Sequence, residues 1–246
     1  MKSYLINANR LKQITVVCSL VLFSQVVHAK SKQYEVVELC SMSQNVLKDK
    51  LLISMDITYS NPEKNLIAVK KKIDTKLLQL KKEKLSKKLH KKIIALKSSW
   101  ATIKKKTEKK VTQEKALNLY TRFNSFDTQC QSLAKGVTSS KSKKKLLFTK
   151  LNLNVQSMTT LYVVKSWDLM DTNLYSKKIA KMISSYQDIR TSLDAVAKKS
   201  DLEKLDKEFT ALKFMVSSSS GRYMPVLANK KASAINDIIT QILEGK

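Results

Sequence analysis

The chain has 246 residues and a formal net charge of +27, because 47 lysines and arginines outnumber 20 acids. It contains three glycines and two prolines, which excludes glycine-rich phosphate loops and disfavours turn-dense β-architectures. No aromatic residues are interleaved with the lysines as in surfaces that read bases, so nucleic acid is not an expected partner. After residue 29, His90 is the single histidine, so a histidine-rich metal site is excluded. We expect no enzyme activity, catalytic residue, metal or cofactor.

The first 29 residues are typical of a signal peptide. Lys2, Arg10 and Lys12 precede an apolar run over residues 14–27, and small residues lead to a cleavage site after Ala29. The alternative is an uncleaved membrane anchor, but a membrane span needs about 20 apolar residues. We therefore expect cleavage after Ala29 and a periplasmic protein.

Two cysteines remain after the signal peptide, Cys40 and Cys130. In an oxidising compartment an even pair predicts a disulfide. Two unrelated buried thiols are the alternative. If Cys40 begins the first helix and Cys130 lies near the end of the fourth, an up-down-up-down bundle brings both to the same end, where they can form a bridge.

Helical periodicity runs through the first half of the mature chain. The pattern predicts a first helix from about Cys40 to Tyr59. Asn61-Pro62-Glu63 then starts a second with a capping side chain, a proline in the first turn and an acid. A third apolar stripe contains Trp100, and a fourth helix starts near 112–114 and stops near Gly136. Four helices with short connections predict an antiparallel bundle.

The second half repeats this plan. A helix is expected over residues 151–170 with Trp167 inside it, a capping box at Ser200–Glu203 opens another, and the last helix starts near Pro225. We expect both tryptophans in the core. Eight identical residues recur in the second half, each 112 positions further on (156 − 44 = 112).

The residues of the first half are Gln44, Asp56, Asn61, Ala68, Ala116, Asn124, Thr128 and Gln129. They match, in the same order, Gln156, Asp168, Asn173, Ala180, Ala228, Asn236, Thr240 and Gln241. The predicted fold is all-α, with tandem antiparallel four-helix bundles over residues 30–138 and 139–246 in up-down-up-down order, the second a diverged repeat.

Three motifs on the first two predicted helices also point to a family. They are Met42-Ser43-Gln44, Lys50-Leu51-Leu52-Ile53 and Thr58-Tyr59-Ser60-Asn61-Pro62. This stretch resembles the opening of NarX-like, PilJ-type sensor domains, the N-terminal domain of type IV pilus methyl-accepting chemotaxis transducers. Asn154-Val-Gln156-Ser-Met158 resembles the same first helix in the second half.

The resemblance implies a periplasmic bundle that senses a small ligand, nitrate in the best-known branch. Ser43, Gln44, Gln156 and Ser157 would be the ligand contacts, unless they serve only as hydrogen bonds between helices or lie exposed. The arginines that usually flank the Ser-Gln patch are absent here, so recognition of nitrate in that manner is not expected. No transmembrane helix or transmitter follows the bundle in this sequence, so the module would signal through a membrane receptor or another envelope protein.

Two functions therefore stand side by side. The first is a non-enzymatic sensor-like module that binds a small molecule. The second is a basic envelope protein that binds an anionic polymer, lipid headgroups or an acidic partner through its lysines. Binding to a polyanion should collapse with rising salt, whereas a ligand held between helices should be less affected. The oligomeric state stays open.

Overall fold

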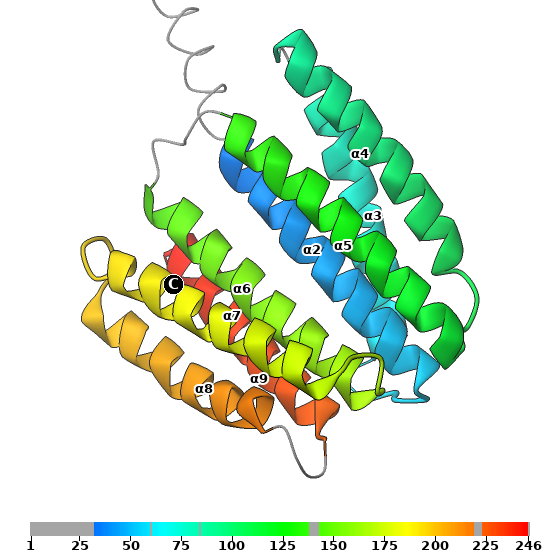
Figure 1. Cartoon of the computed structure of the whole chain (residues 1–246). Helices are drawn as coiled ribbons and strands as arrows, with labels where there is room; N and C mark the ends of the chain where they lie inside the picture. Colours follow the sequence, from blue (N-terminus) through cyan, green and yellow to red (C-terminus); the bar gives the residue numbers. More distant parts are fainter. Residues whose placement is uncertain (1–31, 60, 84, 138–142, 219–222, 246) are drawn as a thin grey trace, which may run out of the picture.

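The structure is a computed structural model that describes residues 32–59, 61–83, 85–137, 143–218 and 223–245. The predicted signal peptide, with its cleavage site, lies outside these residues. Within these ranges the chain forms eight α-helices and no strand, so the predicted all-α class is confirmed (Figure 1). The helices are α2 (Lys32–Ser54), α3 (Pro62–Lys82), α4 (Lys87–Lys106), α5 (Gln113–Gly136), α6 (Lys143–Ser166), α7 (Thr172–Leu193), α8 (Lys199–Ser217) and α9 (Pro225–Glu244).

The outer helices are amphipathic and begin where the local sequence favours a helix start. The Asn61 side chain accepts a hydrogen bond from the Lys64 amide at 3.2 Å, and Pro62 opens α3 as predicted. Ser86 caps α4 in the same way. The predicted apolar stripe of α4 is buried from Ile93 to Ile103, including Trp100. These helices therefore each turn one apolar face inward.

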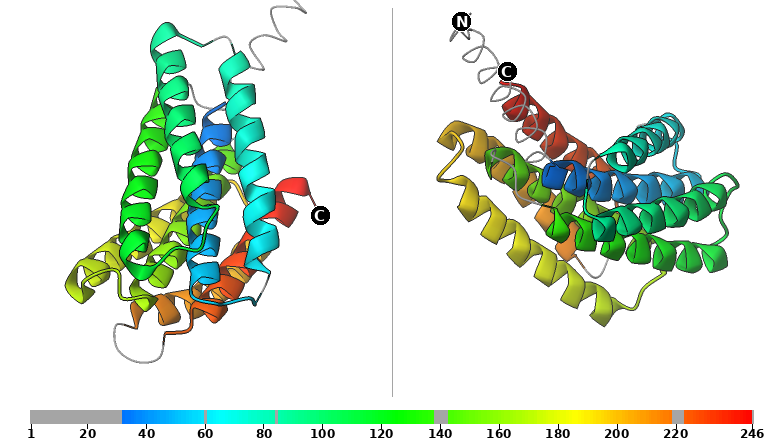
Figure 2. Two further views of the ribbon diagram at one scale, coloured as in Figure 1. Left: turned by 90° about the vertical axis from the view of Figure 1, so that its right-hand side faces the viewer. Right: turned by 90° about the horizontal axis from the view of Figure 1, so that it is seen from above.

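The two central helices, α2 and α6, are buried on most of their surface. They lie side by side in the middle of the molecule and run in the same direction (Figure 1). Helix α2 also contacts α3 and α5, and α4 contacts both of these; α6–α9 form the equivalent ring. Figure 2 shows the two rings joined along α2 and α6. The buried apolar residues of both rings form one core. The division into units at residues 30–138 and 139–246 stays a prediction.

Three predicted helix boundaries were wrong. Helix α2 spans Lys32–Ser54 rather than 40–59, because Asp56 takes a left-handed conformation (φ 60°) that ends the helix. Helix α6 spans Lys143–Ser166 rather than 151–170, so Trp167 lies one residue beyond the helix instead of inside it. In its first turn, Lys145 Nζ lies 4.0 Å from the centre of the Tyr34 ring on α2, which is a cation–π contact between the two central helices.

The third wrong boundary concerns α8. Lys198 occupies its N-cap position and no side chain caps the helix there, so Ser200 lies inside the first turn instead of forming the predicted capping box. Asp201 lies in that turn, where its negative charge interacts favourably with the positive end of the helix dipole. The helix start is therefore supported by charge and packing rather than by a cap.

The helix boundaries recur at the 112-residue offset that the sequence identities predict. Helices α2 and α6 end at Ser54 and Ser166, α4 and α8 start at 87 and 199, and α5 and α9 start at 113 and 225. The structure thus repeats the same four-helix plan along the chain.

The contact between α2 and α6 is reciprocal. Thr160 Oγ1 donates a hydrogen bond to the backbone oxygen of Gln44 at 3.1 Å, and Lys48 Nζ donates one to Gln156 Oε1 at 2.8 Å. At the 112-residue offset, Gln44 corresponds to Gln156 and Lys48 to Thr160. The pair Gln44–Thr160 is therefore repeated, with the helices exchanged, by the pair Gln156–Lys48. This is the pattern of an interface with twofold symmetry.

Candidate functional site

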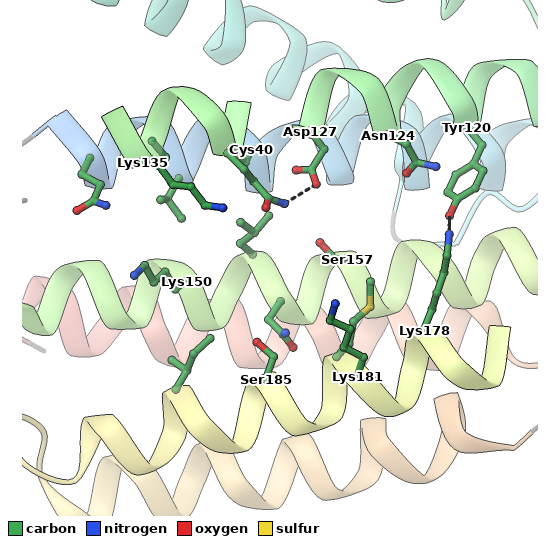
Figure 3. Close-up of a pocket in the computed structure, with 18 residues that line it drawn as sticks. Cys40, Tyr120, Asn124, Asp127, Lys135, Lys150, Ser157, Lys178, Lys181 and Ser185 are labelled. Atoms are coloured by element: carbon green, nitrogen blue, oxygen red, sulfur yellow. Dashed lines mark hydrogen bonds between the residues drawn. The ribbon is translucent and has the colours of Figure 1, made fainter. Parts of the chain in front are cut away.

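A cavity that we call the large groove lies between α5 and α7, with α2 and α6 forming its floor. Its volume is about 570 Å³. Its lining includes Cys40 of α2, Tyr120, Asn124, Asp127 and Lys135 of α5, Lys150, Asn154 and Ser157 of α6, and Lys178, Lys181 and Ser185 of α7. Figure 3 shows these side chains around one opening, with α5 on one side and α6 and α7 on the other. The cavity is within the ~300–1,000 Å³ of typical small-molecule sites.

Four lysines give the large groove a positive charge. Lys178 is engaged, because its Nζ lies 3.3 Å from Tyr120 Oη and bridges the two walls (Figure 3). Lys135, Lys150 and Lys181 have neither an ion pair nor a side-chain hydrogen bond within the described ranges. A ligand with an anionic group would meet three lysines that form no ion pair in the described ranges.

Two oxygen atoms of the same groove are buried and accept no hydrogen bond in the described structure, Asp127 Oδ1 and Asn154 Oδ1. The other carboxylate oxygen of Asp127 accepts from Gln131 Nε2 at 2.7 Å. Burial raises the pKa of Asp127, while the nearby Gln131 and Gln44 side chains act in the opposite direction. Because an unmatched buried acceptor is costly, a ligand that offers N–H or O–H donors is favoured here.

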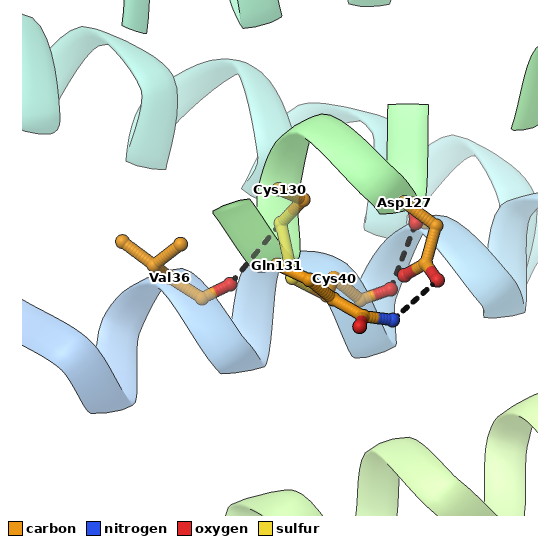
Figure 4. The surroundings of a disulfide bond; sticks show 6 residues. Val36, Cys40, Asp127, Cys130 and Gln131 are labelled. Atoms are coloured by element: carbon orange, nitrogen blue, oxygen red, sulfur yellow. Dashed lines mark hydrogen bonds between the residues drawn. A yellow bond between two sulfur atoms is a disulfide. The ribbon is translucent and has the colours of Figure 1, made fainter. Parts of the chain in front are cut away.

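The predicted disulfide lies beside the large groove, which Cys40 lines. Cys40 on α2 and Cys130 on α5 are bridged, with their Cα atoms 5.8 Å apart. Figure 4 shows the bridge beside the hydrogen bond between Gln131 and Asp127. Cys40 lies two turns inside α2 rather than at its start, but its partner is the expected one. The bridge fixes the wall of the groove that carries Asp127 to its floor.

A second cavity, which we call the small groove, lies on the opposite side of the α2–α6 pair, between α3 and α9. Its volume is about 200 Å³. Its lining includes Asn45, Lys48 and Asp49 of α2, Asn65, Val69 and Lys72 of α3, Gln156 of α6, and Asn229, Ser233 and Asn236 of α9. Three lining positions match the large groove at the 112-residue offset: Asn45 with Ser157, Val69 with Lys181, and Asn236 with Asn124. The two grooves are therefore counterparts in the repeat.

The small groove contains a buried pair of opposite charges. Lys48 and Asp49 are each 4% exposed. Lys48 Nζ donates to Asn45 Oδ1 at 3.0 Å and to Gln156 Oε1 at 2.8 Å. Burial raises the pKa of Asp49 to about 6, and the charge of Lys48 partly opposes this shift. Burial likewise lowers the pKa of Lys48.

The four residues predicted as ligand contacts are not brought to one site. Ser157 lines the large groove and Gln156 the small one. Ser43 lines neither groove, and its hydroxyl donates to the Cys40 carbonyl at 2.8 Å. Gln44 is 7% exposed and lines neither groove, although its side chain acts to lower the pKa of Asp127. All four residues lie on the central helices, but they divide between two cavities and the core.

Sequence reasoning missed the residues that give each groove its charge. Lys150 and Lys181 look like ordinary surface lysines, and their convergence depends on how α6 and α7 pack. The position of Asp49 could have indicated a buried charge, because it lies with Lys48 among apolar residues on a helix that has no polar face. Asn124 and Asn236 could also have been noticed from the sequence, because they are one of the identical pairs shared by the two halves.

Comparisons with family models, with curated proteins and with solved structures found no match for this chain. None of the helices in the described ranges is long and apolar enough to span a membrane. Those ranges also hold no group of three or more histidine, cysteine, aspartate or glutamate side chains placed to bind a metal ion.

Proposed function

We propose that the protein is an exported, non-enzymatic, sensor-like module that binds a small anionic ligand in the large groove. The observation that carries the proposal is the set of unmatched groups around this cavity. Lys135, Lys150 and Lys181 lack a carboxylate partner there, and the buried oxygens of Asp127 and Asn154 lack a donor.

The ligand would complement both kinds of group. An anionic group would bind the lysines, and hydroxyl or amine donors would reach Asp127 and Asn154. Hydroxy acids and phosphorylated or sulfated polyols have this chemistry. Most of the chain resembles NarX-like, PilJ-type sensor domains in its motifs, and a periplasmic location would suit the disulfide between Cys40 and Cys130. Signalling would then pass through a receptor or another envelope protein.

A thermal-shift screen of the mature protein against anionic metabolites tests the proposal, because a ligand of the native state raises the melting temperature. Calorimetry would then measure the affinity of each hit. Lys181→Gln should weaken binding about tenfold or more, since it removes a charged hydrogen-bond donor. Lys177→Gln is the matched control: this lysine is exposed on the same helix but does not line the groove.

Two results would contradict the proposal. One is equal binding by Lys181→Gln, Lys177→Gln and the wild type. The other is a response confined to polymers, lost between low and moderate salt, which would favour the alternative of a basic envelope protein. N-terminal sequencing of the exported protein tests export and signal-peptide cleavage separately, with Lys30 as the expected first residue.

A further inference from the structure

We infer that the small groove is a second binding site, and that its ligand is a small zwitterion, an α-amino acid with a short side chain. This site lies on the opposite side of the α2–α6 pair from the large groove, and the inference does not depend on the function proposed for that groove.

The first observation is a pair of deep acceptors without donors. Asp49 is 4% exposed and makes no hydrogen bond or ion pair within the described ranges. Asn229 is 5% exposed, and its Oδ1 is buried and unpartnered. Both residues line the same cavity, from α2 and α9. Because buried acceptors are normally satisfied, the groove offers a place for a group that donates several hydrogen bonds, as an ammonium group does.

The second observation concerns the other charges. Lys48 Nζ is already held by Asn45 and Gln156, so it balances Asp49 electrostatically without occupying its oxygens. Lys72 lines the cavity from the exposed side of α3 and has no ion-pair partner in the described part of the chain. A simple amine would add a third positive charge beside these two lysines. A carboxylate on the same ligand removes that repulsion by binding Lys72.

The third observation is size. A cavity of about 200 Å³ is smaller than the ~300–1,000 Å³ sites that take drug-sized ligands. The apolar surface available beside the charged groups is limited, with Ala68 and Val69 contributed by α3. These features fit glycine, alanine or serine better than an amino acid with a long side chain.

Calorimetry on the mature protein, with glycine, L-alanine and L-serine as probes, tests the inference. Ethylamine and propionate are the comparators, because each keeps one of the two charges of alanine. At least one amino acid should bind, and its comparators should bind about tenfold more weakly or worse, since each leaves a charged group unmatched. Binding of ethylamine as tight as that of alanine would overturn the inference, and so would no binding by any of the three amino acids.

Two matched pairs of variants locate the site. Lys72→Gln should weaken amino-acid binding about tenfold, while Lys71→Gln, the exposed neighbour on α3, should not. Asp49→Asn should abolish binding, whereas Asp237→Asn, exposed on α9, should leave it unchanged. Because Lys72 is exposed, its variant should fold even if Asp49→Asn does not. Amino-acid binding that is lost in Lys181→Gln and kept in Lys72→Gln would place the ligand in the large groove and refute the second site.

Discussion

Asp56 and Asp168 take the same left-handed backbone conformation directly after the two central helices, with φ of 60° and 54°. The hydrogen bonds around them match as well. The amide of the next residue reaches back to the helix in both cases, from Ile57 to Leu52 at 2.9 Å and from Leu169 to Val164 at 3.1 Å. This is the Schellman arrangement that ends many helices. It fixes the turns that lead into α3 and α7, and so the walls of the two grooves.

Glycine should stabilise the turn at Asp168. A non-glycine residue in this conformation costs about 1–2 kcal/mol, and the Asp168 side chain is 87% exposed and 3.7 Å from Lys165, a contact of little value at the surface. Asp168→Gly should therefore gain about 0.5–1 kcal/mol in urea unfolding, while Asp168→Ala should lose stability. Equal losses in both variants would show that the side chain, not the backbone, decides this position.

The two tryptophans should differ in their contribution to stability. Trp100 is 2% exposed and its Nε1 donates to Asp74 at 2.8 Å. Trp167 lies just after α6 and is only partly buried, so the expected core position is confirmed for Trp100 and was wrong for Trp167. Trp100→Ala should cost about 3–5 kcal/mol, and Trp167→Ala should cost clearly less. Denaturant unfolding of both variants measures the difference. A larger loss at Trp167 would reverse our assignment of which ring packs in the core.

Reduction of the disulfide should destabilise the whole molecule rather than one half. Cys40 and Cys130 close a loop with a sequence separation of 90, for which loop entropy predicts up to about 4–5 kcal/mol. Because α2 packs on α6, both halves should unfold together. In Trp100→Phe and Trp167→Phe, which each leave one tryptophan reporter, the fluorescence melt should coincide with the circular-dichroism melt of the same variant, and both should shift together on reduction. Two separate melts would show independent units, and two free thiols in the oxidised, unfolded protein would refute the bridge.

Stability should respond to pH through Asp49. Its pKa is raised from 3.8 to about 6 in the folded protein, so the folded state binds the proton more tightly. The contribution of this group is therefore greatest below pH 4 and declines as pH rises to 6, by on the order of 3 kcal/mol. Relative to wild type, Asp49→Asn should become more stable over that interval. Urea unfolding at pH 4, 5, 6 and 7 checks the trend, and a difference that does not change with pH would contradict it.

The outer helices were predictable from the sequence because each has one apolar face. The stripe through Ile93, Leu96 and Trp100 gives α4, and Asn61 with Pro62 gives the start of α3. Residues on such faces repeat at helical spacing whatever the partner helix is. The sequence therefore defines these elements locally.

The grooves were not predictable in the same way. Helices α2 and α6 bury polar and apolar residues alike, so they have no stripe that indicates their neighbours. Lys150 and Lys181 become members of one site only when α6 and α7 pack side by side, and nothing in the spacing of either residue indicates this. Ser43 was misleading for the opposite reason: it belongs to a suggestive motif, but its hydroxyl bonds within its own helix.

The reciprocal contact between α2 and α6 has the geometry of a homodimer interface, yet both partners belong to one polypeptide. Two identical chains would associate according to their concentration and would carry two identical grooves. Covalent linkage makes the pairing intramolecular. It also allows a position in one half to change while its counterpart in the other half stays the same. Val69 and Lys181 show the result: the same position is apolar beside one groove and cationic beside the other. Under the two binding proposals above, the repeated scaffold would recognise two chemically different molecules.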